Sequence, residues 1–306
     1  MEGVSGALCT TEGWMSMQEK RWLALGGLLI TMTVLTGCGG LAFSSTQPVT
    51  HHHKPKSRSL GQASKKPKSS PIYKPKSTSI PIQGATFPTI MQMAMSHLKG
   101  LAASNAQAPT MVPWPSDGST TLFYAPKIQG LGSSIPGLIE RYQVTLSSSA
   151  KSPVASFSTA VFSDPNAAKQ YLYDILADRQ LTYPPPGPGV EVGSGVTATS
   201  GIDGHHNILG WVEGDWSIVI GKVGHLPMVL ARIAADYLNT HVIPTPEPEG
   251  QGQGVIVVAA KQNGAVYAEV AWQEGRWVYS TATYPTTKNT VTTALALAVS
   301  MRRYAK

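Results

Sequence analysis

The chain has 306 residues, a formal net charge of +7 and two cysteines. Eight basic residues and no acid lie between positions 39 and 89, whereas positions 90–306 hold 14 basic and 14 acidic residues. The region long enough to fold is therefore neutral overall, which argues against a nucleic-acid-binding domain, and two cysteines exclude a disulfide-dense exported fold.

The first predicted element is a cleaved export signal in residues 1–37. Its apolar run from Trp22 to Leu35 follows Lys20 and Arg21 and is about 14 residues long, whereas a membrane-spanning helix needs about 20. This length and the basic flank are typical of a secretory signal. The residues before Lys20 include no Lys or Arg, so we expect the true start at Met15 or Met17.

The signal ends in Leu35-Thr36-Gly37-Cys38, which resembles the lipobox of bacterial lipoproteins. The resemblance implies that Cys38 becomes the first residue of the mature protein and carries diacylglycerol with acyl chains such as palmitate. The protein would then be anchored to the cell membrane on its extracytoplasmic face. The alternative is a free cysteine in an ordinary signal or membrane anchor. With Cys38 lipidated, no disulfide could form in the mature chain.

Residues 38–89 are predicted to be a disordered linker after the lipidated cysteine. They are rich in Lys, Pro and Ser, repeat "KPK" three times, and offer little apolar surface to bury. Their positive charge favours contact with anionic lipid or wall polymers, and a passive tether is the alternative. We expect the triplet His51–His53 to be incidental.

The folded region is predicted to be α+β, with two related units that each combine an antiparallel β-hairpin or sheet with a helix. The first unit covers 90–243, a Pro/Gly linker covers 244–254, and a second, smaller unit covers 255–306. Strands are expected at 144–146, 156–162, 190–199, 207–221, 255–261, 265–273 and 276–283. Helices are expected from Asp164-Pro165 to about residue 179, from 227 to 239, and from 287 to 304.

A hairpin motif occurs twice, as WVEGDW at 211–216 and as WQEGRW at 272–277. With Glu-Gly as the central turn residues, the two tryptophans of each copy would face one another, and the match suggests duplication. One interpretation makes the tryptophans a platform for sugar rings. We favour a core role, because the apolar faces of the following helices need a partner. The four candidates are Trp211, Trp216, Trp272 and Trp277.

The order of lipobox, basic linker and two WxEGxW hairpins with helices is similar to uncharacterised exported lipoproteins of Gram-positive-type bacteria. That resemblance implies a location and a domain class, but no chemistry. No nucleophile elbow, metalloprotease or CxxC motif is present. Asp203, His205 and His206 could suggest zinc, but adjacent strand residues point to opposite faces. Glu213 and Glu274 could suggest a catalytic pair, but exposed turns with ordinary pKa values are expected.

The sequence thus predicts a lipid-anchored cell-surface protein that binds a partner or stabilises an envelope assembly without catalysis. We expect no catalytic residue, metal or cofactor, and no nucleic-acid partner, and the sequence does not identify a protein partner. The alternatives are an enzyme acting on cell-wall polymer, with residues assembled only by the fold, and a solute-binding lipoprotein of a transport or signalling system.

Overall fold

The computed structural model describes residues 86–130, 132–178, 181, 183–247 and 252–304, which belong to one compact unit. The expected signal, Cys38 and most of the basic linker lie outside these ranges. Within them, every helix is too short or too polar to cross a membrane.

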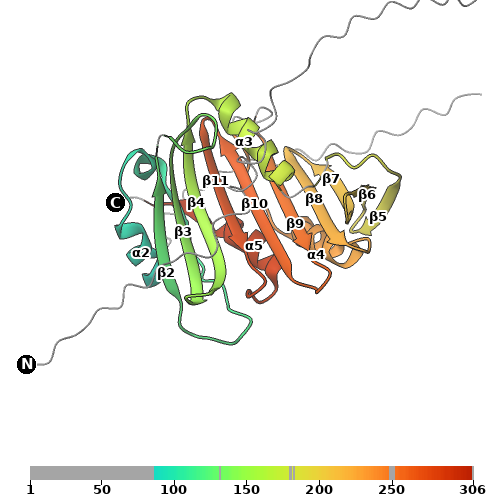
Figure 1. Cartoon of the computed structure of the whole chain (residues 1–306), viewed down its shortest axis with the longest axis horizontal. Coiled ribbons are helices and arrows are strands. Elements are labelled where there is room, and N and C mark those ends of the chain that lie inside the picture. Colours follow the sequence, from blue (N-terminus) through green and yellow to red (C-terminus); the bar gives the residue numbers. More distant parts are fainter. Residues whose placement is uncertain (1–85, 131, 179–180, 182, 248–251, 305–306) are drawn as a thin grey trace, which may run out of the picture. The chain divides into compact units, whose positions relative to one another are not determined.

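Ten strands form one sheet in the order β2-β3-β4-β11-β10-β9-β8-β7-β6-β5 (Figure 1). All neighbouring strands are antiparallel except β8 and β9, which are parallel, so the predicted α+β class with antiparallel sheet is confirmed. The strands are β2 (Phe123–Gln129), β3 (Leu138–Ser149), β4 (Ser152–Phe162), β5 (Gly189–Gly193), β6 (Val196–Asp203), β7 (His206–Glu213), β8 (Trp216–Val223), β9 (Gly254–Ala260), β10 (Val266–Glu274) and β11 (Trp277–Thr283).

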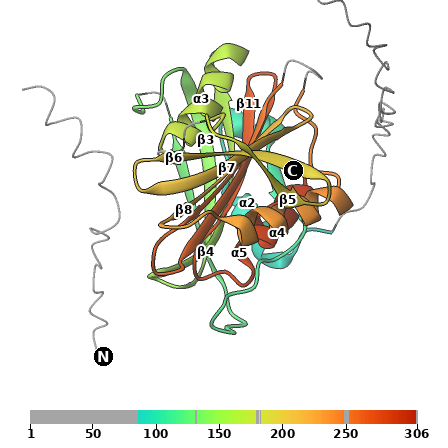
Figure 2. The ribbon, with the colours of Figure 1, turned by 90° about the vertical axis from the view of Figure 1, so that its right-hand side faces the viewer.

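Helices cover both faces of the sheet (Figure 2). Helix α3 (Pro165–Asp178) packs on one face, and α2 (Thr89–Ser96), α4 (Met228–Thr240) and α5 (Thr290–Ser300) pack on the other. The central strand β9 reads GVIVVAA and is buried on both faces, as expected for a strand between two helical layers. Its Ile256 and Val258 join the core under α4 and α5, and Val255 and Val257 join the core under α3.

Helix α3 begins where the sequence predicts, at Pro165 after Asp164. The Oδ1 atom of Asp164 accepts hydrogen bonds from the backbone N–H groups of Asn166 (2.9 Å) and Ala167 (3.0 Å). This is the expected role of an N-cap aspartate. The bond from Ala167, with help from the Ser163 hydroxyl, lowers the pKa of Asp164 because it stabilises the charged form.

The last helix is shorter than the expected 287–304. Asn289 adopts a left-handed conformation with φ of 52°, and the hydroxyl of Thr287 is bonded to the carbonyl of Val154, so helical geometry begins only at Thr290. After Ser300 the chain becomes extended as β12 (Met301–Arg303), which pairs with β1 (Gln107–Pro109). The end of the chain is therefore held by a strand pair.

The segment 244–254, expected to divide two units, leads from α4 into β9, and β9 lies beside β8 in the same sheet. Trp216 of β8 is paired with Gly254 of β9, and Val219 with Val257. At the other side of the later unit, β11 pairs with β4 over seven residue pairs. Residues 90–243 and 255–306 therefore contribute to one sheet and share both cores.

Candidate functional site: a slot between diverging strands

Both repeated hairpins turn one residue later than the sequence suggested. Glu213 is paired with Trp216, and Glu274 with Trp277, so the central turn residues are Gly-Asp and Gly-Arg. The glycines have φ of 59° and 60°, as the first central position of a type II′ turn requires. The prediction that the two tryptophans of each hairpin face one another is therefore wrong. Trp211 lies opposite Ile218, and Trp272 opposite Tyr279.

The tryptophan contact instead joins one hairpin to the other. The rings of Trp216 and Trp272 lie 6.5 Å apart between centroids, above Gly254, which is paired with both residues. A Cβ atom on Gly254 would lie 2.5 Å from the Trp216 ring. Trp211, Trp216 and Trp272 are 6%, 5% and 0% exposed, and Trp277 is half-buried. The four candidates thus occupy the space between the sheet and its helices.

In the second hairpin, the tryptophan and glutamate form a closed network. The indole Nε1–H of Trp272 donates to Oε1 of Glu274 (3.2 Å), and the side-chain amide of Gln107 donates to the same oxygen (3.0 Å). Desolvation by burial is the main cause of a raised pKa for Glu274, and these two hydrogen bonds oppose it. The expectation of an exposed turn with an ordinary pKa is therefore wrong for Glu274.

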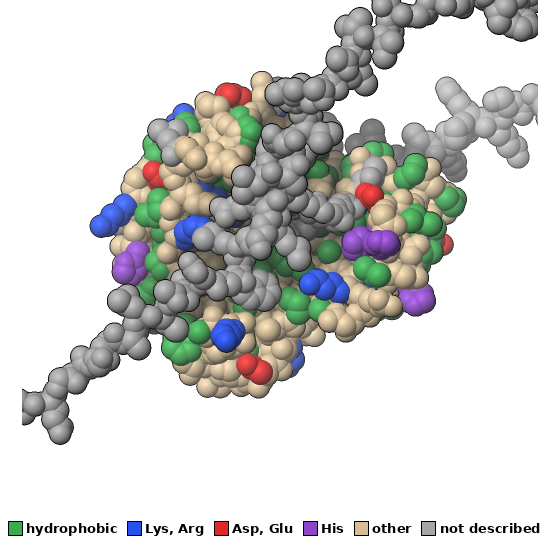
Figure 3. Space-filling model, in the orientation of Figure 1, with side chains coloured by type: hydrophobic (Ala, Val, Ile, Leu, Met, Phe, Trp, Pro, Cys, Tyr) green, Lys and Arg blue, Asp and Glu red, His purple; other side chains and the backbone are tan. Residues whose placement is uncertain are grey.

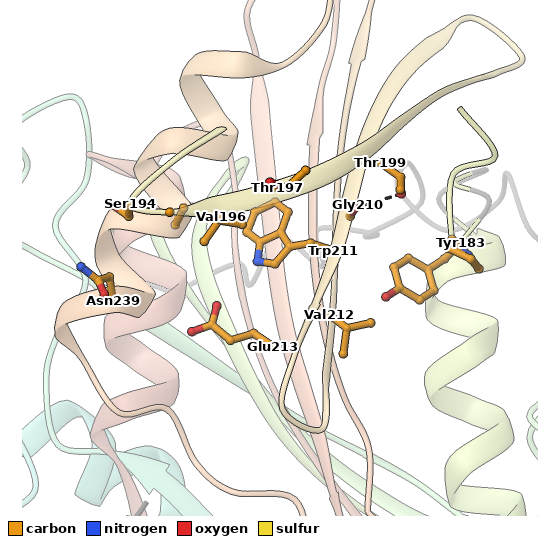
Figure 4. A pocket seen from close by; sticks show the side chains of 13 residues that line it. Tyr183, Ser194, Val196, Thr197, Thr199, Gly210, Trp211, Val212, Glu213 and Asn239 are labelled. Atoms are coloured by element: carbon orange, nitrogen blue, oxygen red, sulfur yellow. Dashed lines mark hydrogen bonds between the residues drawn. The ribbon is translucent and has the colours of Figure 1, made fainter. Parts of the chain in front are cut away.

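In the first hairpin, the equivalent residues Trp211 and Glu213 do not form such a network. The indole Nε1 of Trp211 is buried and has no hydrogen-bond acceptor in the part of the chain that the structure describes. The carboxylate of Glu213 is exposed and lines the same cavity (Figure 4). Buried polar groups are normally satisfied. Three described side chains hold an unpaired buried polar atom, Trp211, Arg141 and Gln273. Of these, Trp211 lines this cavity, which marks the first hairpin as the functional candidate.

The cavity exists because β6 and β7 diverge. Their pairing ends at Thr199 and Gly210, where the Thr199 hydroxyl donates to the Gly210 carbonyl (3.2 Å) and closes the inner end (Figure 4). Beyond that point β6 pairs with β5, so residues 211–213 are paired on the β8 side only within the described ranges. Residues beside a two-residue turn form a hydrogen-bonded pair. The backbone N–H and C=O of Val212 therefore point away from β8, into the slot.

Helix α4 and the turn between β5 and β6 form the other walls of this slot. Ala235 and Asn239 face it from α4, and Ser194 and Thr197 face it from the β5–β6 hairpin. The Ser194 hydroxyl donates to Oδ1 of Asp236 (2.5 Å), which joins the hairpin to the helix. The slot has a volume of about 590 Å³, within the roughly 300–1,000 Å³ of small-molecule sites. Glu213 is the charged residue among those lining it.

The other sequence candidates do not assemble into a site. Asp203 and His206 are paired across β6 and β7, and His205 lies in the turn between them. Within the described ranges, no group of three or more His, Cys, Asp or Glu side chains could hold a metal ion.

Sequence reasoning missed the slot, although the two motif copies differ at the second position. Gln273 is buried, and its amide donates to the carbonyl of Pro165 (2.8 Å). Its counterpart Val212 is 64% exposed. That difference was the available signal that one copy is enclosed and the other is open. Comparison of the chain with protein-family models, curated proteins and solved structures finds no match.

Proposed function

We propose that this chain is a lipid-anchored protein of the extracytoplasmic membrane face that binds an extended peptide segment of a partner without catalysis. The lipobox ending in Cys38 supports the anchor, and the basic linker supports a tether that contacts anionic lipid or wall polymers. The slot between β6 and β7 supports the binding role.

The observation that carries the proposal is the comparison of the two hairpins. In the second, a side-chain amide from Gln107 reaches the carboxylate beside the tryptophan. In the first, the side chains of Trp211 and Glu213 line a cavity instead, and the buried indole N–H of Trp211 has no acceptor among the described residues. An amide group supplies a donor for the carboxylate and an acceptor for the indole. A peptide also carries the backbone groups that would pair with Val212, as in strand addition to a sheet edge.

The lining of the slot supports binding over cell-wall hydrolysis. The hydroxyl of Ser194 donates to the carboxylate of Asp236, and an aspartate is ordinarily a far weaker base than the histidine that activates serine nucleophiles. The lining residues include no histidine.

The matching hairpins, each followed by a helix, further support our proposal that β7-β8-α4 and β10-β11-α5 arose by duplication.

An array of capped pentapeptides rich in β-branched residues tests the binding role of the intact chain. Hydrogen bonds to charged groups contribute about 1.5–3 kcal/mol, so Glu213→Gln should weaken retained peptides by about ten- to a hundredfold. Trp211→Phe removes the indole donor and keeps a ring, and should weaken them by about three- to tenfold. Glu191→Gln makes the same charge change on β5, outside the slot, and should bind as the parent does.

The proposal is contradicted if the parent retains no peptide above background. Equal retention by the parent, Glu213→Gln and Trp211→Phe would also contradict it, because the peptides would then bind elsewhere.

A further inference from the structure

Trp114 is the exposed tryptophan among those that the structure describes, with 65% of its surface accessible. Its loop between β1 and β2 is fixed by backbone contacts to the segment before α5. The carbonyl of Trp114 accepts from the N–H of Lys288 (2.9 Å), and the N–H of Ser116 donates to the carbonyl of Thr286 (2.7 Å). Pro115 and Thr287 form an isolated β-bridge. These contacts therefore fix the backbone that carries the exposed indole of Trp114.

A cavity of about 680 Å³ lies beside this indole, between the loop and the start of α5. Lys288 and Asn289 line it as hydrogen-bond donors, and Ser116, Thr287 and Thr293 line it with hydroxyl groups. The Thr293 hydroxyl donates to the Lys288 carbonyl (2.7 Å), and that of Thr287 to the Val154 carbonyl. The Thr293 oxygen keeps its lone pairs for a ligand donor, whereas the Thr287 oxygen is buried and accepts from the N–H of Tyr284 (3.2 Å). No carboxylate is among the lining residues.

Asn289 provides a second indication, beside the polar lining of the cavity, that this is a ligand site. It is the N-cap residue of α5, yet its side chain makes no capping hydrogen bond. Its φ of 52° is uncommon for a residue other than glycine, and such conformations cluster at ligand sites. The side-chain amide therefore lies beside the cavity without capping the helix.

We propose that this cavity binds a sugar ring that carries an anionic substituent. The indole of Trp114 would stack on the apolar face of the ring, and the hydroxyls and the Asn289 amide would pair with sugar hydroxyls. Lys288 would pair with the anionic group. Aromatic surface with a few placed polar groups is the usual composition of a small-ligand site. The proposed peptide slot uses other residues, so the two proposals stand independently.

Isothermal titration of the intact chain with a hexameric oligogalacturonate and with neutral maltohexaose tests this site. Every protein in the series carries Gln at the eight basic linker positions, so that the linker does not bind the anionic sugar. Trp114→Ala should weaken both sugars at least about tenfold and leave the thermal midpoint unchanged, because the ring is exposed. Lys288→Gln should weaken the oligogalacturonate about tenfold and leave maltohexaose unchanged.

Asn289→Gly provides a variant that cannot lose binding through misfolding. Glycine adopts the left-handed conformation without strain, so stability should be equal or higher while sugar affinity falls. Val229→Ala changes an exposed apolar residue of α4 and should bind both sugars as the parent does. Failure of the parent to bind either sugar, or unchanged affinity in Trp114→Ala, would overturn the proposal. Loss of attachment to phosphatidylglycerol vesicles by Trp114→Ala, with sugar binding intact, would overturn it as well.

Discussion

Gly254 is the residue on which the contact between the two hairpins depends. It is paired with Trp216 on one side and with Trp272 on the other, and the two rings meet above it. Its φ is not in the left-handed region, so the requirement for glycine is purely the space taken by the Trp216 ring.

We expect Gly254→Ala to lower the free energy of unfolding by about 1–3 kcal/mol, the usual range for overpacking a core. Trp216→Phe shortens the ring that causes the clash, so the double variant should lose less than the sum of the single variants. Urea midpoints measure all three. Gly130→Ala is the control, because nothing lies within 4 Å of its added Cβ. Equal losses in Gly130→Ala and Gly254→Ala would contradict this account.

The half-buried carboxylate of Glu274 should give the protein a specific pH dependence. Burial raises its folded pKa above the ordinary 4.5, so the folded state binds the proton more tightly than the unfolded state. Its contribution to stability is present below the ordinary pKa and is lost as the pH rises through the raised folded pKa. Glu274→Gln keeps an acceptor for Trp272 and Gln107, and should therefore become more stable relative to the parent as the pH rises.

Asp164→Asn supplies the control of opposite sign. The folded pKa of Asp164 is lowered, so its contribution is present above the unfolded pKa and is lost as the pH falls through the folded pKa. Urea midpoints across the acidic range should show opposite trends for the two variants. Parallel trends would contradict the assigned environment of Glu274.

At the scale of elements, the sequence was most informative where its pattern was local. The start of α3 follows from Asp164-Pro165, and both hairpins follow from apolar runs around a Glu-Gly pair. Strand β2 was missed because FYAPKIQ contains Pro126 and lies at the edge of the sheet, where proline is tolerated. The pairing of β1 with β12 joins residues almost 200 positions apart, and no local pattern predicts it.

The slot could be predicted only in part, because the two hairpins look alike in sequence. The motif WxEGxW identifies both hairpins, and it places Trp211 with Glu213 and Trp272 with Glu274. It does not reveal that Gln107, 167 residues before Glu274, reaches the second copy. Nor does it show that β6 leaves β7 at Gly210 and thereby opens the first copy. Both features arise from tertiary packing.

The hairpins should respond unequally to loss of their tryptophans. Truncation of a large buried aromatic residue costs about 3–5 kcal/mol, a large share of the usual 5–15 kcal/mol. Trp272→Ala should be the most severe change, because Trp272 is fully buried and bonded to Glu274. Trp277→Ala should be the mildest, because Trp277 is half-buried. At least two of the four variants should be severe by urea midpoint, and near-parental values for all four would refute a core role.

At the scale of the whole molecule, the net positive charge of the sequence comes from residues before position 90. Eight basic residues and no acid lie at positions 39–89, and the residues from position 90 on are balanced in charge. Figure 3 shows acidic and basic side chains dispersed over the described surface in view, without a patch of one sign. A neutral binding unit on a basic tether is the arrangement that our proposal requires next to an anionic membrane or wall.

The proposed lipid anchor at Cys38 can be tested by substitution. Cys38→Ser removes the thiol that the lipobox would present for lipidation, so the variant should remain an unlipidated precursor. Metabolic labelling with a fatty-acid analogue measures this directly, and Ser45→Ala, a change in the adjoining linker, is the control that should label as the parent does. Equal labelling of Cys38→Ser and the parent would contradict the lipoprotein assignment.

The most direct test of the peptide slot is the indole N–H resonance of Trp211 in a ¹H–¹⁵N correlation spectrum. Trp211→Phe assigns the resonance, and Trp272, whose N–H is already bonded to Glu274, is the internal reference. Titration with N-methylacetamide, and then with the capped pentapeptide Thr-Val-Thr-Val-Thr, should shift the Trp211 indole proton downfield as it gains an acceptor. The Trp272 resonance should stay in place, and Glu213→Gln should need more peptide for the same shift. A Trp211 resonance that does not move, or that moves together with Trp272, would contradict the proposed binding site.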